Sequence, residues 1–129
     1  MKKIKNFNHT FVIPTFKKSP YLLDCLKSIK KQRLKSNIII TTSKPFKGIS
    51  KLCKRFNVKL YIYQKHNNIS DDWNRALSVA KTKWVTITHQ DDVYLPNYLL
   101  NIQKISKGKK NISIIFTDYA EINKNITIL

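Results

Sequence analysis

The chain has 129 residues, of which 42% are hydrophobic and 11% aromatic, and its formal net charge is +18. A chain of this length forms one domain that buries roughly two-thirds of its unfolded surface, and its apolar content argues against disorder. No apolar run approaches the roughly 20 residues of a membrane helix, and residues 1–6 are too polar for a signal peptide, so we expect a cytoplasmic protein.

The large positive charge has two interpretations. One is attraction to a polyanion, such as a nucleic acid, an anionic membrane surface or a nucleotide-bearing substrate. The other is a compositional bias that fills solvated faces with lysine, and this one is favoured because the lysines are scattered over every segment and outnumber the arginines. Cys25 and Cys53 lie far apart in helical patterns, so we expect reduced thiols and neither a disulfide nor a zinc site.

Apolar strand patterns alternate along the chain with helical ones. Short β-branched and apolar runs predict strands at 9–13, 37–41, 59–63, 84–88 and 112–116, with a last short strand at 126–129. Apolar residues at helical spacing predict helices at 21–29, 49–56, 70–80 and 96–107. Ser70 is the expected N-cap of the third helix, where Asp71 and Asp72 would complement the helix dipole.

This alternation predicts an α/β fold with a mostly parallel, Rossmann-like sheet and helices on both faces, in a single domain over residues 1–129. Ligands of such sheets bind beyond the carboxyl ends of the strands. Three segments with polar side chains therefore fall along one rim: residues 14–16, Thr42 with Ser43, and residues 89–92.

The run His89-Gln90-Asp91-Asp92 is notable because the chain has only seven acidic residues. Two adjacent carboxylates that follow a buried strand are well placed to hold a hard divalent cation, which can in turn hold a diphosphate. The alternative is a solvated acidic turn that binds nothing.

Four stretches, taken in order, resemble family 2 glycosyltransferases with the GT-A fold. They read Phe-Val-Ile-Pro-Thr-Phe at 11–16, Asp-Trp-Asn-Arg-Ala-Leu at 72–77, Ala-Lys-Thr-Lys-Trp-Val-Thr-Ile at 80–87 and His-Gln-Asp-Asp-Val-Tyr-Leu-Pro at 89–96. The resemblance extends from about residue 11 to about residue 121. It implies sugar transfer from a nucleotide-diphosphate-sugar, with UDP-sugars favoured, to a hydroxyl of a glycan or lipid-linked acceptor in polysaccharide or glycan synthesis.

The resemblance also suggests roles for individual residues. Donor-binding positions are Pro14, Thr15, Phe16, Thr42, Ser43, Asn74, Arg75, His89, Gln90 and Asp91. The DXD motif of the family aligns with His89-Gln90-Asp91, so Asp91 is the expected ligand of Mn²⁺ or Mg²⁺, and Asp92 either joins it or hydrogen-bonds the loop. Purely structural alternatives exist: Pro14 as a strand terminator, Phe16 as a core ring and Arg75 as a surface cation.

Three departures from the family pattern affect the expected function. His89 replaces the first aspartate of the motif, and Thr42 and Ser43 stand where many relatives have an aspartate that reads the nucleobase. The family's catalytic base lies well beyond the DXD loop, and Asp118 is only a weak candidate for it. We therefore expect the donor-binding half of a glycosyltransferase, as a truncated enzyme, a fragment completed by another chain, or a binding remnant.

Two further expectations concern partners. A sheet without its remaining strands would expose an unpaired edge, which predicts self-association or a partner chain. Lysines would allow peripheral attachment at the inner face of the membrane. A small nucleic-acid-binding protein is the rival function, but the sequence has no signature of the common nucleic-acid-binding modules, so nucleic acid is not the expected partner.

Overall fold

The computed structural model describes residues 7–125 and 128. Its strands are β1 (His9–Phe16), β2 (Asn37–Lys44), β3 (Lys59–Ile62) and β4 (Trp84–Ile87). Its helices are α1 (Leu22–Lys30), α2 (Ile49–Phe56), α3 (Ile69–Val79) and α4 (Tyr98–Ser106). All paired strands are parallel, in the order β3-β2-β1-β4, which confirms the predicted α/β sheet.

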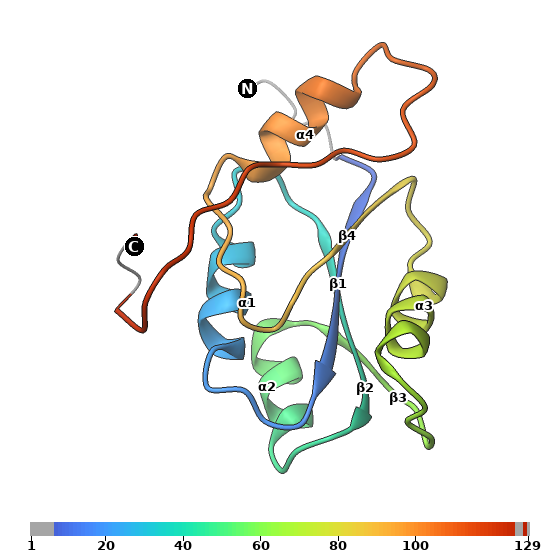
Figure 1. Cartoon of the computed structure of the whole chain (residues 1–129), viewed down its shortest axis with the longest axis vertical. Coiled ribbons are helices and arrows are strands. Elements are labelled where there is room, and N and C mark those ends of the chain that lie inside the picture. The colour runs from blue at the N-terminus through green and yellow to red at the C-terminus, as the bar shows by residue number, and fades with distance from the viewer. Residues whose placement is uncertain (1–6, 126–127, 129) are drawn as a thin grey trace.

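The sheet is covered on both faces because β1 and β2 alternate their apolar side chains between two clusters. Phe11 and Ile13 point into the larger cluster, which α1, α2 and α4 complete. Val12 points the opposite way and packs with Ile39 and with Ala76 of α3. Figure 1 shows α1 and α2 on one side of the strands and α3 on the other. The apolar runs that predicted buried strands therefore report burial on both faces.

β1 continues to Phe16, three residues beyond its predicted end, although Pro14 lies within it. The Val12 carbonyl accepts a hydrogen bond from Thr88 N, so backbone groups at this alternate position of β1 face β4. Pro14 faces the same way, beyond Ile87, where β4 has already ended. Its missing N–H therefore costs no ladder bond, and the proline does not stop the strand.

No strand forms at residues 112–116, where the sequence predicted one. The segment after α4 is irregular, and Ile114 and Phe116 are 69% and 86% exposed. A strand needs a neighbouring backbone as well as a suitable pattern, and in the described part of the chain β4 pairs with β1 alone. The strand predicted at 126–129 lies largely outside the described residues; Ile128 forms an isolated bridge with Ile122.

His9 lies at the amino end of β1 and is 1% exposed. Its Nδ1 is 2.8 Å from Ser36 Oγ and its Nε2 is 2.8 Å from Thr86 Oγ1, so hydroxyls contact both ring nitrogens. Burial lowers the pKa of His9 to about 4, and the ring is neutral at physiological pH. None of the described helices is long and apolar enough to cross a membrane.

Candidate functional site

A cleft of about 250 Å³ lies at the carboxyl ends of β1 and β4, against the first turn of α3. Its lining residues are Pro14, Thr15, Phe16, Ile69, Asp72, Trp73, His89, Gln90 and Asp91. Six of the residues expected at the site from sequence thus line one cavity. Ile69, Asp72 and Trp73 were not expected there.

The wall formed by β1 is shaped by a bulge in β2. Thr15 pairs with Thr42 and Phe16 pairs with Lys44, so Ser43 has no opposite residue in β1. A bulge of this kind redirects side chains. Here Ser43 Oγ points to Asp72, and the Phe16 ring is 39% exposed at the cleft.

The wall formed by the loop after β4 is tied to its surroundings through backbone and amide groups. The Cys25 thiol donates to the His89 carbonyl at 3.5 Å, and Gln90 Nε2 donates to the Phe16 carbonyl at 3.5 Å. The His89 ring meets Trp73 edge to face, with their centroids 5.0 Å apart. Burial raises the pKa of Cys25 to about 12, with smaller contributions from Asp92 and Asp91. This thiol therefore stays protonated and serves as a structural donor, not as a nucleophile.

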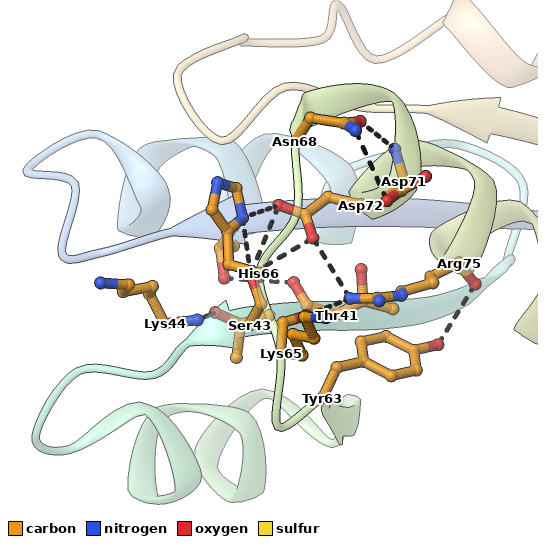
Figure 2. Close-up of polar contacts among 12 residues, drawn as sticks. Thr41, Ser43, Lys44, Tyr63, Lys65, His66, Asn68, Asp71, Asp72 and Arg75 are labelled. Atoms are coloured by element: carbon orange, nitrogen blue, oxygen red, sulfur yellow. Dashed lines mark hydrogen bonds and ion pairs between the residues drawn. The ribbon is translucent and has the colours of Figure 1, made fainter.

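A second polar cluster, shown in Figure 2, surrounds Asp72 of α3. Ser43 Oγ donates to Asp72 Oδ1 at 3.2 Å, and His66 Nδ1 lies 3.0 Å from Asp72 Oδ2. Because a carboxylate only accepts, His66 Nδ1 carries the proton of this bond. Arg75 Nη1 is 3.8 Å from Asp72 Oδ1. Asp72 is thus held from β2, from the loop before α3 and from its own helix.

The sequence predicted Ser70 as the N-cap of α3, and this is wrong, whereas Asp71 and Asp72 do lie in the first turn of the helix as expected. The N-cap of α3 is Asn68, whose Oδ1 accepts from Asp71 N at 2.9 Å. With the cap two residues earlier than Ser70, Asp72 falls on the turn that faces the sheet. Asn68, three residues before an acid, was the signal that could have placed the cap, since asparagine is a preferred capping residue.

Other predicted donor residues lie outside the cleft lining. Arg75 lies with its guanidinium carbon 5.0 Å from the centroid of the Tyr63 ring and donates to the Lys65 carbonyl. Asn74 is exposed. Thr42 is buried, and its Oγ1 accepts from Lys44 N at 3.1 Å. Asp118 is exposed in the segment after α4, where its Oδ1 accepts from Tyr119 N at 2.9 Å.

The residues of the cleft suit a divalent cation only if phosphate groups of a bound substrate supply further ligands. Within residues 7–125 and 128, no group of three or more His, Cys, Asp or Glu residues could hold a metal ion. In the same part of the chain, the carboxylates of Asp91 and Asp92 make no hydrogen bond or ion pair. Magnesium is often held by one or two carboxylates together with substrate phosphates. Asp91 therefore suits an ion that arrives with a diphosphate.

Comparisons with known proteins agree with this fold. The family model described as "Glycosyl transferase family 2" matches residues 10–127. The chain is similar in structure to a mannosyltransferase from Pyrobaculum calidifontis in complex with GDP-Man and Mn²⁺, with a TM-score of 0.68 and 18% identity, over 80% of this chain and 33% of that one. It is also similar to TarS 1-349 of S. aureus, with a TM-score of 0.69 and 14% identity, over 91% of this chain and 42% of that one.

These structures share the fold, and the chain spans less than half the length of either. No sequence among the curated proteins matches the chain.

Proposed function

Because the chain belongs to glycosyl transferase family 2, we propose that its cleft binds the nucleotide-sugar donor of a glycosyl transfer reaction. The observation that carries this proposal is the free carboxylate of Asp91, in one cavity with the exposed Phe16 ring. A nucleoside diphosphate needs both an apolar surface for its base and a partner for its phosphate charge. UDP-sugars are the donors we would test first.

We propose Mn²⁺ or Mg²⁺ as the cofactor, bound together with the donor's diphosphate. Asp91 would be its ligand from this chain, and Asp92, the next residue of the loop, is the second candidate. When bound, the ion neutralises the charge of the diphosphate leaving group, which is worth several kcal/mol. His89 contributes a ring that is oriented by Trp73 and lies at the cleft, suited to hydrogen-bonding a ribose or phosphate oxygen.

We propose that the described residues bind the donor and that the exposed segment after α4 contacts a second copy or a partner chain. Asp72 and Asp91 are the acids that line the cleft, and Asp118 and Glu121 are exposed outside it. The exposed Phe116 and Tyr119 rings of the same segment are apolar surface for such a contact. Analytical ultracentrifugation should show association that grows with concentration, and a single monomeric species at high concentration would contradict this part of the proposal.

The donor-binding proposal is tested by calorimetric titration of UDP with and without Mn²⁺. We expect binding to the unchanged chain that depends on the ion, and loss of that dependence in Asp91→Asn. Asp118→Asn is the matched control, because it removes an exposed carboxylate outside the cleft and should bind like the unchanged chain. Salt-sensitive binding of oligonucleotides that ignores Asp91, with no binding of UDP, would instead favour a nucleic-acid-binding protein.

A further inference from the structure

Resting on the proposed donor site, we propose that Asp72 reads the nucleobase of the donor and selects uracil or guanine over cytosine and adenine. Asp72 belongs to α3 and shares the cleft with Asp91. Its carboxylate is hydrogen-bonded by Ser43 and His66, whereas the Asp91 carboxylate makes no such bond among the described residues.

The Asp72 carboxylate is fixed in place and still has acceptor capacity. A carboxylate offers about four lone-pair sites. Ser43 and His66 each occupy one, and Arg75 faces Oδ1 from 3.8 Å. The side chain is 12% exposed and lines the cleft, so at least one acceptor site remains open toward a ligand there.

Asp72 is also poorly suited to hold a metal ion. His66 lies 3.0 Å from its Oδ2, and the Arg75 guanidinium lies close to its Oδ1, so its charge already has partners. A divalent ion would have to compete with these groups, whereas the Asp91 carboxylate makes no such contact in the described part of the chain. This leaves hydrogen-bond acceptance as the function of Asp72 toward a ligand.

Aromatic rings beside Asp72 make the same corner suitable for a base. The Phe16 ring lies 4.7 Å from the His66 ring that holds Asp72, and Trp73 is the next residue of α3. Both Phe16 and Trp73 line the cleft. A base that stacks on these rings excludes water from its own polar edge. The exclusion of water strengthens a hydrogen bond from that edge to the Asp72 carboxylate.

The chemistry of a fixed carboxylate determines which bases it accepts. Uracil presents one ring N–H between two carbonyls, and guanine presents a ring N–H beside an amino group, so both donate to a carboxylate. Cytosine and adenine place a ring nitrogen lone pair beside their amino group, and that lone pair repels the second carboxylate oxygen. Asp72 therefore predicts tighter binding of UDP and GDP than of CDP and ADP.

The test compares the four nucleoside diphosphates by calorimetry in Mn²⁺, on the unchanged chain, Asp72→Asn and Asp71→Asn. In Asp72→Asn, the amide oxygen is expected at the position of Oδ2, which lies 3.0 Å from His66 Nδ1 and 3.4 Å from Ser43 Oγ, so the amide NH₂ takes the position of Oδ1 and replaces an acceptor with a donor. The ratio of UDP to CDP affinity should fall roughly tenfold or more, the range for a hydrogen bond to a charged group. Asp71→Asn removes the same charge one residue away and outside the cleft lining, so it should keep the original ratio.

Three results would overturn the inference alone: equal binding of all four diphosphates by the unchanged chain, an equal loss for all four in Asp72→Asn, or no change. Failure of the unchanged chain to bind any of them would overturn the proposed function and the inference with it. Ser43→Ala guards against misfolding of Asp72→Asn, because it leaves the carboxylate in place and removes one of its donors. It should reduce the base preference severalfold, and an unchanged preference would contradict the proposed positioning.

Discussion

The chain contains two Asp-Asp pairs, and they take opposite forms in the same cleft. In Asp71-Asp72, the second residue enters the cleft and is held by Ser43, His66 and Arg75. In Asp91-Asp92, the first residue enters, and its carboxylate makes no contact of this kind within the described residues. Similar sequence therefore produces one carboxylate that is fixed by hydrogen bonds and one that has no such contact among the described residues, because a helical turn and a loop present neighbouring side chains differently.

The largest expected effect is a loss of Mn²⁺ affinity on substitution in the Asp91-Asp92 pair. Asp91→Asn should weaken binding of Mn²⁺ in the presence of UDP by roughly 100-fold or more, since even residues behind the ligands change metal affinity 10–100-fold. Asp92→Asn should change it by only about threefold, because Asp92 does not line the cleft. Electron paramagnetic resonance of free Mn²⁺ measures both. Equal losses in the two variants would show that the pair acts as a unit.

A pH effect on stability is expected from His9, at the opposite end of the sheet. It is similar in size to the effect expected for Asp91→Asn and involves neither Asp-Asp pair. Burial lowers the pKa of His9 to about 4, so between about pH 6.5 and pH 4 the unfolded chain binds more protons than the folded one. The free energy of unfolding should fall by about 3 kcal/mol as the pH decreases through this window. Urea denaturation at a series of pH values measures it. His9→Phe should flatten the slope, and a wild-type slope in that variant would remove His9 as the cause.

Changes in the free energy of unfolding should distinguish Asp72 from Asp91 more directly. Asp72→Ala leaves Ser43 and His66 without their acceptor and should lower the free energy of unfolding by about 2 kcal/mol. Asp91→Ala removes a side chain without partners among the described residues and should change it by at most about 0.5 kcal/mol. Chemical denaturation of both variants is the measurement. Equal destabilisation would end the distinction between a fixed and a free carboxylate.

The smallest effect is expected at Arg75, which the sequence placed near the donor. In the structure it contacts Asp72 and does not line the cleft. Arg75→Lys loses the stacking on Tyr63 and should cost about 1 kcal/mol of stability. The affinity for UDP should change only about twofold to threefold, since Arg75 does not line the cleft. A large loss of affinity with unchanged stability, measured by calorimetry and urea denaturation, would return Arg75 to the donor site.

The sequence predicted the parallel sheet and two of the three segments that line the cleft, including Asp91, because these depend on local patterns that end at the same edge of a parallel sheet. It could not predict Asp72, since the carboxylate enters the cleft through a cap at Asn68 and a bulge at Ser43. Both features shift a register by one or two residues, which composition and periodicity do not resolve. The strand expected at 112–116 failed for a related reason: its pattern is local, but its pairing partner is not.

A double-mutant cycle tests most directly whether the two carboxylates have separate functions. UDP and CDP would be titrated with Mn²⁺ into the unchanged chain, Asp72→Asn, Asp91→Asn and the double variant. We predict that Asp91→Asn weakens binding of both nucleotides equally, that Asp72→Asn changes the ratio of their affinities, and that the two effects add within about 0.5 kcal/mol. A change of the ratio in Asp91→Asn, or a coupling well above that value, would contradict this prediction.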